Sequence, residues 1–543
     1  MATTERYHPL QINKEHPNFS PCRMVVETAF YGNNVTRIDS MQQAYELAKE
    51  ASGTIVSDYE INDPESIGLD PGSKVLVFND GRITGRTPKA RKNLNRNALD
   101  YENYVGDVRQ ALFLERDRRY YHASAYVGTH HDFMVKAHLL VPEGWESLLY
   151  QWLLNFEPVT ADSEEEYLKS MPFKDEGDIY LLAIPDYLDP AYPIGLSLFE
   201  GEGNCGAILG LNTFVEYKKG TLSLAWAIAE RRDFIPVHGG QKRYQKDKDP
   251  SKTVLFIGLT GSGKSVLTNH KHTEGYEETV LHDDALIISA NYGDAISMER
   301  GYFEKTDDCD LSEPRFAHLL SAQNQGVIVN HLGEKMIVAG DLRNENGRVL
   351  LSEKACKNRV FHMKEAPSEI FWIIKDPVLP PVIKVTDPIL ALSFAGTLSN
   401  INITKSDSDL LKESEPLSIQ PFGNPFRTYP AVNDYHRFKK LIEERKIESY
   451  IFNTGYFMGR EISKELTISV TEQIIAQEAH FVPWKECEGF EILEILGYQP
   501  DFSDASYKSY FVSRLKERIA FLEKEEFPAE AIAALEKLSK GLA

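Results

Sequence analysis

Apolar residues along this chain gather in short continuous runs that are bounded by polar or turn-forming residues. Such runs predict buried β-strands, because a strand that is covered on both faces needs no polar alternation. The strands expected on this basis are 73–78, 178–184, 253–257, 369–374 and 449–452.

Two further segments have the apolar spacing of amphipathic helices. The first covers 145–154, and the second lies near the C-terminus, where Pro528 suits the first turn of a last helix. The apolar face of the second segment consists of Phe511, Leu515, Ile519 and Leu522.

Strands and helices are mixed in the first half, whereas strands dominate from about residue 233 to about residue 480. We therefore expect an α/β protein with an N-terminal α/β domain over 1–233 and a C-terminal domain over 234–543 that ends in helices. The charged stretch 241–252 is expected to form an exposed loop before the strand at 253–257.

The composition is that of a globular chain with large cores: 543 residues, 42% hydrophobic and 26% charged. The net charge of −21 argues against nucleic acid as the main partner, so we expect a small-molecule ligand. The five cysteines have neither zinc-site nor disulfide-framework spacing. The first residues lack the apolar core of a signal peptide, and no apolar run reaches membrane length. We expect a cytoplasmic protein without a membrane partner.

The run at 253–257 leads into a phosphate-binding pattern, Gly-x-x-x-x-Gly-Lys-Ser. Its glycines allow backbone N–H groups to surround phosphate oxygens, its lysine brings a positive charge to the β- and γ-phosphates, and its serine hydroxyl can bind Mg²⁺. The alternative is an ordinary glycine-rich turn. The residues expected to bind the nucleotide are Gly258, Leu259, Thr260, Gly261, Ser262, Gly263, Lys264 and Ser265.

A pair of carboxylates, Asp283 and Asp284, follows the next apolar stretch. A hard cation that bridges phosphates needs oxygen ligands, and two adjacent aspartates could serve two metals. The alternative is an acidic turn at the end of a solvated strand.

From about residue 70 to the C-terminus, the order and spacing of several motifs resemble ATP-dependent phosphoenolpyruvate carboxykinase. The resemblance implies a two-domain carboxykinase-like fold, with a mixed-sheet N-terminal domain on the substrate side and a C-terminal domain that binds nucleotide and metal. Besides the phosphate-binding pattern and the aspartate pair, the motifs are Thr84-Gly-Arg86-Thr-Pro-Lys89, Glu216-Tyr-Lys218-Lys219-Gly220, His238, Leu379-Pro-Pro-Val382, Phe394-Ala-Gly-Thr397 and Asn453-Thr-Gly455.

If function follows the resemblance, the chain decarboxylates oxaloacetate and phosphorylates the enolate with ATP, or catalyses the reverse. The resemblance implies that Arg86 holds a substrate carboxylate, since a guanidinium matches it in two hydrogen bonds. It also implies that Mn²⁺ is bound by Lys219, His238 and Asp284.

The resemblance gives further roles to residues around the phosphates and the base. Ser265 would bind Mg²⁺ together with the ATP phosphates, and Lys264 with Lys218 would neutralise the transferring phosphoryl group. Arg460 and Thr471 would lie at the nucleotide base.

Several positions depart from the family pattern. Thr213 stands where the family has a tyrosine, and Gly-Gly-Gln follows His238 in place of Cys-Ser-Ala. The family's mobile lid continues Glu-Arg-Gly after Thr397, whereas here the residues are Leu-Ser-Asn. Arg348 and Arg359 both suit a further arginine that contacts substrate and phosphate.

The residues that would bind metal and triphosphate are thus retained. The residues that the family uses to recognise oxaloacetate and CO₂ and to close the lid are altered. Three hypotheses remain: a divergent carboxykinase, a metal-dependent kinase that acts on another small carboxylate or hydroxylated molecule, and a non-catalytic nucleotide-binding protein. The sequence leaves the oligomeric state open.

Overall fold

The computed structural model describes residues 19–78, 89–170, 176–247, 250–271, 275–305, 319, 321–338, 348–351, 358–400 and 416–542. The chain divides into two compact units. One consists of Met1–Ile228 and Met298–Lys357, and the other of Ala229–Ser297 and Asn358–Ala543. The predicted boundary at 233 lies close to Ile228, where the chain leaves the first unit. The segment Met298–Lys357 also belongs to the first unit, although the prediction placed it in the C-terminal domain.

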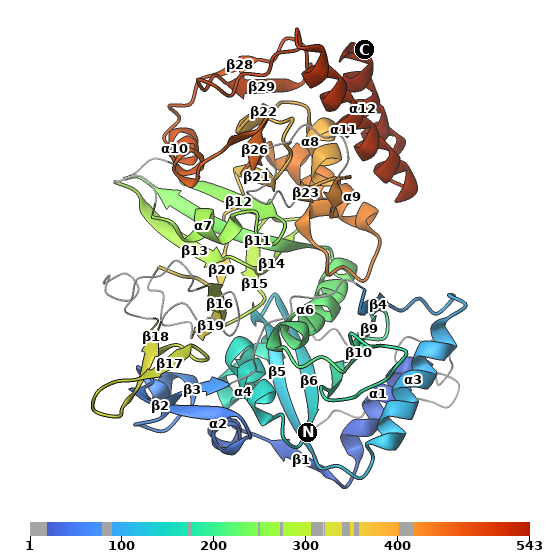
Figure 1. The fold of residues 1–543 in the computed structure, drawn as a ribbon, viewed down its shortest axis with the longest axis vertical. Coiled ribbons are helices and arrows are strands. Elements are labelled where there is room, and N and C mark those ends of the chain that lie inside the picture. The colour runs from blue at the N-terminus through green and yellow to red at the C-terminus, as the bar shows by residue number, and fades with distance from the viewer. Residues whose placement is uncertain are drawn as a thin grey trace. The chain divides into compact units, whose positions relative to one another are not determined.

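The first unit contains a mixed sheet of eight strands: β1 (Val35–Ile38), β4 (Arg91–Asn93), β5 (Tyr120–His130), β6 (Phe133–Pro142), β7 (Glu157–Pro158), β8 (Ile179–Ile184), β9 (Leu196–Glu200) and β10 (Cys205–Leu209). The order is β1-β5-β6-β8-β10-β9-β4, with β7 paired to β5 (Figure 1). Strands β5 and β6 are antiparallel, whereas β8 runs parallel to β6 and β10.

The helices of this unit are α1 (Pro21–Thr28), α2 (Met41–Glu50), α3 (Tyr101–Leu114), α4 (Glu146–Asn155) and α5 (Ala161–Lys169). A longer helix, α6 (Phe214–Arg231), crosses the division between the units. Val26 of α1 and Val105 of α3 pack in one hydrophobic cluster with Leu182 and Ala207 of the sheet. The remaining strands form two-stranded ladders: β2 (Thr54–Glu60) with β3 (Lys74–Phe78), β16 (Tyr302–Lys305) with β19 (Arg348–Leu351), and β17 (Gly326–Val329) with β18 (Lys335–Val338).

The second unit contains a mixed sheet of eleven strands: β11 (Phe234–Gln245), β12 (Lys252–Gly258), β13 (Glu277–His282), β14 (Ala285–Ser289), β15 (Ala295–Ser297), β20 (His362–Met363), β21 (Glu369–Ile374), β22 (Val382–Val385), β25 (Glu448–Asn453), β28 (Phe481–Pro483) and β29 (Phe490–Leu493). The order is β20-β15-β14-β11-β12-β21-β25-β22-β29-β28, with β13 paired to β11 (Figure 1). The central strands β12, β21 and β25 are parallel.

Helices cover both faces of this sheet: α7 (Lys264–Asn269), α8 (Pro388–Ala395), α9 (Ala431–Arg445), α10 (Lys464–Ile475), α11 (Ala505–Lys524) and α12 (Ala529–Leu542). Leu255 and Ile257 of β12 belong to the core with α8, α9, α11 and α12, whereas Val254 and Phe256 belong to the core with α7 and α10. Burial on both faces explains why this strand reads as a continuous apolar run. Two short ladders complete the unit: β23 (Ser399–Asn400) with β24 (Ser418–Ile419), and β26 (Tyr456–Phe457) with β27 (Arg460–Glu461).

The mixed α/β architecture and the strands and helices predicted from the apolar pattern are confirmed. The predicted loop at 241–252 is wrong in its first part, because β11 continues to Gln245; Lys246 and Asp247, before β12, are exposed as expected. Lys242 is buried there, and its Nζ lies 2.7 Å from Glu278 Oε2 on the neighbouring strand. A buried ion pair therefore allows a charged sequence to form an interior strand.

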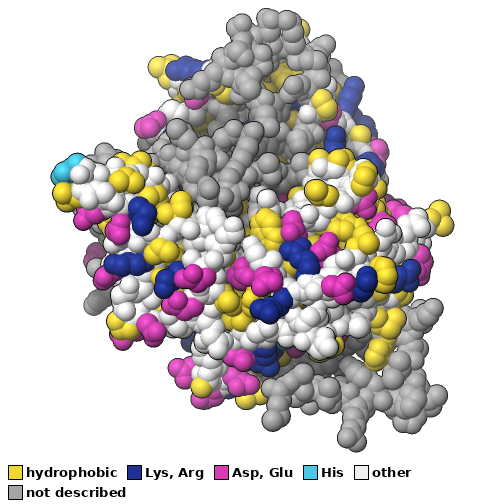
Figure 2. Space-filling view, turned by 60° about the horizontal axis from the view of Figure 1, so that its bottom comes forward, with side chains coloured by type: hydrophobic (Ala, Val, Ile, Leu, Met, Phe, Trp, Pro, Cys, Tyr) yellow, Lys and Arg dark blue, Asp and Glu magenta, His cyan; other side chains and the backbone are white. Residues whose placement is uncertain are grey.

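Acidic and basic side chains of the described residues are interspersed on the face drawn in Figure 2. Among the described residues, every helix is too short or too polar to cross a bilayer.

Candidate active site

The loop between β12 and α7 contains the phosphate-binding pattern. Gly258 ends the strand, and Gly263 precedes the helix with φ +97°, a left-handed conformation that favours glycine. The Ser262 N–H donates to the Leu259 carbonyl at 3.1 Å. The Thr454 hydroxyl donates to the Ser262 carbonyl at 2.8 Å, so a second segment also fixes the loop. The pattern therefore lies in the strand–turn–helix context that phosphate binding requires.

The first helical residue, Lys264, is 6% exposed, and its Nζ donates to the Leu259 carbonyl at 3.0 Å. Thr260, Gly261 and Ser265 are exposed. The loop thus presents backbone and a hydroxyl to solvent while the lysine lies beneath it.

His238 lies on β11, opposite Ala285 of β14. The imidazole is buried, and its Nδ1 lies 2.7 Å from the Gly423 carbonyl oxygen. Because a carbonyl only accepts, Nδ1 is the donor in this contact. On the other side of the ring, Nε2 lies 3.1 Å from Asp284 Oδ1. The backbone contact thus orients Nε2 toward a carboxylate, as second-shell partners do for metal-binding histidines.

Asp283 lies in the turn between β13 and β14, where its Oδ2 accepts from Asn269 Nδ2 at 2.9 Å. Arg359 is held beside β13 by a parallel bridge to Val280. Burial lowers the pKa of Arg359 to about 9, although the negative charge of Asp283 acts in the opposite direction. The competing arginine, Arg348, lies on β19, and its side chain is outside the described residues.

In the first unit, α6 carries two buried lysines. Lys218 Nζ lies 3.0 Å from Glu299 Oε1, and Asn155 Nδ2 donates to the same oxygen at 2.7 Å. Lys219 Nζ lies 5.9 Å from the centre of the Trp226 ring. Lys218 thus has a buried counter-charge.

Sequence reasoning missed Glu299 and Asn155, because neither residue belongs to a motif that the sequence analysis used. The available signal was indirect, since a buried lysine needs a partner with negative charge.

The other predicted residues lie in different settings. Arg86 is outside the described residues. Arg460 is exposed on β27, with its guanidinium 4.5 Å from the centre of the Tyr498 ring. Thr471 is fully buried in α10, and its hydroxyl donates to the Thr467 carbonyl at 2.9 Å.

A family model described as phosphoenolpyruvate carboxykinase matches residues 72–493 of this chain. The chain belongs to the phosphoenolpyruvate carboxykinase family. Three curated relatives, each named phosphoenolpyruvate carboxykinase (ATP), show how far this chain differs from them in sequence. The chain is 25% identical to the Aeropyrum pernix protein over 342 residues, which cover 60% of this chain and 67% of that one. It is 24% identical to the Staphylococcus haemolyticus protein over 423 residues and to a Staphylococcus aureus protein over 428 residues, with 73% of this chain and 76% of each relative covered.

This chain is therefore a divergent member of an ATP-dependent carboxykinase enzyme family. One departure from the family pattern, the Gly-Gly after His238, has a packing reason. A Cβ atom at Gly240 would collide with the Thr268 side chain of α7. The close approach of α7 to β11 thus requires glycine at this position.

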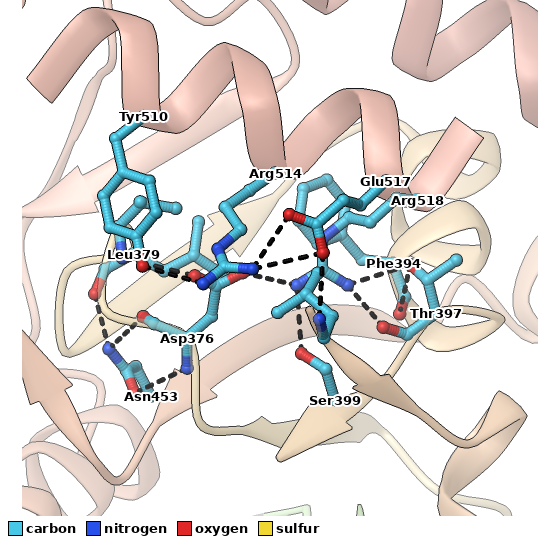
Figure 3. Close-up of polar contacts among 12 residues, drawn as sticks. Asp376, Leu379, Phe394, Thr397, Ser399, Asn453, Tyr510, Arg514, Glu517 and Arg518 are labelled. Carbon is cyan, nitrogen blue, oxygen red and sulfur yellow. Dashed lines mark hydrogen bonds and ion pairs between the residues drawn. The ribbon is translucent and has the colours of Figure 1, made fainter. Parts of the chain in front are cut away.

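The altered residues after Thr397 lie in a buried cluster around Arg518 of α11 (Figure 3). The guanidinium of Arg518 lies 2.6 Å from Asp376 Oδ2, and it also donates to the carbonyl and hydroxyl of Thr397 and to the hydroxyl of Ser399. Leu398 between them is fully buried in the core with α8 and α11. In this carboxykinase, an apolar residue therefore packs where the family pattern has a charge.

Proposed function

We propose that this carboxykinase converts oxaloacetate and ATP to phosphoenolpyruvate, ADP and CO₂, or catalyses the reverse. The conversion belongs to the family at large, and the other two sequence hypotheses are not favoured by the family match. The observation that carries the proposal for this chain is the fixed orientation of His238 Nε2 toward Asp284, one strand from the phosphate-binding loop.

The nucleotide side of the proposal rests on the loop from Gly258 to Ser265. Its exposed backbone would take the ATP phosphates, and the Ser265 hydroxyl would bind Mg²⁺. Lys264 would leave the Leu259 carbonyl for a phosphate oxygen, because an anionic acceptor forms the stronger hydrogen bond.

The donors around His238 fit a divalent cation. An imidazole nitrogen and a carboxylate oxygen are common ligands of Mn²⁺. Their separation of 3.1 Å is close to the roughly 3 Å between neighbouring ligands that lie about 2.1 Å from one ion in octahedral geometry. The proposal gives His238 and Asp284 as ligands and Lys219 as a third. A bound cation would supply positive charge that stabilises enolate and phosphoryl oxygens.

The remaining residues act on the substrate and the transferring group. Breaking the bond to the departing CO₂ leaves its electron pair as an enolate, whose oxygen then attacks the γ-phosphorus of ATP. Lys218, kept in place by Glu299, would neutralise charge during this transfer. The further arginine that contacts substrate and phosphate would be Arg359, since its guanidinium interacts with the charge of Asp283.

Phosphoenolpyruvate formation by the purified full-length chain tests the proposal, with ATP, Mg²⁺ and Mn²⁺ present and oxaloacetate omitted as the control. We expect product that depends on oxaloacetate and on metal. Hydrolysis of ATP without phosphoenolpyruvate, at saturating oxaloacetate, would contradict the assignment of the acceptor.

The metal site is tested apart from activity by Mn²⁺ binding in electron paramagnetic resonance. His238→Ala should weaken Mn²⁺ binding at least about tenfold, because it removes one ligand. His436→Ala, which alters an exposed histidine on α9, is the matched control. Equal Mn²⁺ affinity in the two variants would remove His238 from the ligand set.

A further inference from the structure

A cavity lies in the unit that contains the phosphate-binding loop, at the opposite ends of the parallel strands of the eleven-stranded sheet. It has a volume of about 810 Å³ and is bordered by the first residues of the parallel strands β12, β21 and β25, which are Lys252, Glu369 and Glu448. The phosphate-binding loop follows Gly258, at the other end of β12. The length of β12 therefore separates this cavity from the proposed ATP site.

Four aromatic side chains border the cavity: Tyr244, Tyr276, Tyr450 and Phe481. The rings of Tyr450 and Phe481 lie 5.6 Å apart, centre to centre, at 51°. Tyr244 on β11 and Tyr450 on β25 are buried, and β12 and β21 lie between these two strands. Tyr276 and Phe481 are partly exposed, so their rings offer flat apolar surface to a planar ring.

Four lysines and two glutamates also border the cavity. One lysine, Lys252, lies 3.6 Å from Glu369 Oε1 and donates to the Ile474 carbonyl at the end of α10 at 3.0 Å. A second, Lys384, lies 2.7 Å from Glu448 Oε1. Both glutamates are thus matched by a lysine.

The other two lysines, Lys246 and Lys446, form no ion pair with a carboxylate of the described residues. Lys246 Nζ lies 5.5 Å from the centre of the Tyr276 ring, and Lys446 follows the last residue of α9. The border of the cavity therefore has a surplus of positive charge, on a protein whose net charge is −21. Such a local excess attracts anions.

Burial raises the pKa of Glu369, and the neighbouring charge of Glu448 acts in the same direction. Its Oε2 accepts from the Ser368 hydroxyl at 2.6 Å. This hydrogen bond and the charge of Lys252 act in the opposite direction on the pKa of Glu369.

We propose that this cavity binds a small planar aromatic anion, with its ring against Tyr276 or Phe481 and its phosphate or carboxylate attracted by the charges of Lys246 and Lys446. The volume lies within the range of about 300–1,000 Å³ that is usual for small-molecule sites. A nucleoside monophosphate and an aromatic carboxylate share this chemistry. The inference is independent of the proposed reaction, because it uses none of the residues assigned to it.

Equilibrium dialysis of the full-length chain tests the site with AMP and 4-hydroxybenzoate as probes. Adenosine supplies a ring without charge, and inorganic phosphate supplies charge without a ring. The protein is used both unaltered and as Lys264→Ala, which weakens phosphate binding at the β12–α7 loop and so separates the two sites. A Lys246→Gln/Lys446→Asn double variant removes the unmatched charges, and Asn suits position 446 because its φ is +54°.

We expect at least one of the two anions to bind in the Lys264→Ala background, and its affinity to fall about tenfold in the double variant, since each partly exposed charge contact is worth a few-fold. The anion that binds more tightly identifies the source of the ligand. Lys440→Gln, which alters an exposed lysine on α9 outside the cavity, should leave the affinity unchanged.

Three results would overturn the proposal. The first is the absence of saturable binding of either anion below about 5 mM, the weak end of specific affinities. The second is equal affinity in the double variant and its parent. The third is binding of adenosine or inorganic phosphate as tight as that of the best anion. Phosphoenolpyruvate formation should be unchanged in the double variant, so failure of this site is distinguishable from failure of the proposed reaction.

Discussion

Two parts of the second unit are held in place by different kinds of contact. The loop from Gly258 to Ser265 is shaped by its own backbone and by a short helix, and His238 is fixed by a backbone carbonyl. The segment from Thr397 to Ser399 also has backbone hydrogen bonds, but in addition one distant side chain, Arg518, donates to the Thr397 carbonyl and to the hydroxyls of Thr397 and Ser399.

This difference parallels the pattern of retained and altered residues. A phosphate site made of backbone N–H groups tolerates only a few residue types, so its motif can be recognised from the sequence. A segment held by a buried ion pair can change its own residues as long as the pair remains. In this chain, Leu398 takes up buried space beside the Asp376–Arg518 pair.

The largest effect should come from Lys264→Ala in the loop. Loss of a positive charge at the transferring phosphoryl group should lower kcat/KM for phosphoenolpyruvate formation by about 100- to 1,000-fold, by analogy with removal of one donor to a developing charge. Steady-state kinetics measure the change, and Lys271→Ala, an exposed lysine beyond α7, is the control. A loss of less than tenfold in kcat/KM would show that the backbone of this loop positions the phosphates without the lysine.

Glu299→Gln tests whether a side-chain contact also matters for the retained residues. The amide preserves the shape but removes a negative charge 3.0 Å from the buried Lys218 Nζ, so the pKa of Lys218 should fall. We expect kcat/KM to drop about 10- to 100-fold and the alkaline limb of its pH profile to move to lower pH, because Lys218 then loses its proton earlier.

Glu27→Gln is the matched control for this prediction. It removes a carboxylate that lies 2.8 Å from Arg23 Nε on α1, in the same unit. A pH profile of Glu299→Gln that matches this control would mean that Glu299 is structural only.

Arg518→Met should destabilise the altered segment. It leaves Asp376 as a buried unpaired carboxylate and removes three hydrogen bonds to Thr397 and Ser399, so we expect a loss of about 3–5 kcal/mol in the free energy of unfolding. Thermal unfolding of the single variant and of Arg518→Met/Asp376→Asn measures it. The double variant should recover part of the loss, and a double variant less stable than the single one would contradict the role of the lone charge.

Local patterns allowed several elements of this molecule to be predicted. The strand at 253–257 and the helix with Phe511 and Leu515 follow from apolar spacing, since burial on one or both faces leaves a periodic trace. The pairing of His238 with Asp284 was expected only through the family resemblance.

Contacts between residues far apart in the sequence produce no such periodic pattern. The pairs Lys218–Glu299 and Asp376–Arg518 join residues far apart in the sequence, and their charged side chains look like surface residues until the fold is known. The same reason explains the error at 241–245, where the charged residues belong to a strand and Lys242 forms a buried pair with Glu278.

The smallest effect should arise from a substitution of Asp434. Its side-chain ion pair lies next to the backbone segment that orients His238. This buried carboxyl lies 3.7 Å from Arg427, whose guanidinium donates to the Pro421 carbonyl, next to the segment that contains Gly423 and so orients His238. Burial raises the pKa of Asp434 to about 7, although Arg427 and the Tyr429 hydroxyl act in the opposite direction.

Because the folded pKa of Asp434 lies above that of an unfolded aspartate, the folded state holds its proton more tightly. The stabilisation from this group is complete below about pH 4 and is lost as the pH rises through 7. Asp434→Asn mimics the protonated form and should therefore flatten the fall in stability between about pH 5 and 7. Urea unfolding at several pH values measures the slope, with Asp387→Asn, at the exposed start of α8, as control. An unchanged slope in Asp434→Asn would mean that the carboxyl remains ionised beside Arg427, and the retained site would then rest on a charge pair like that of the altered segment.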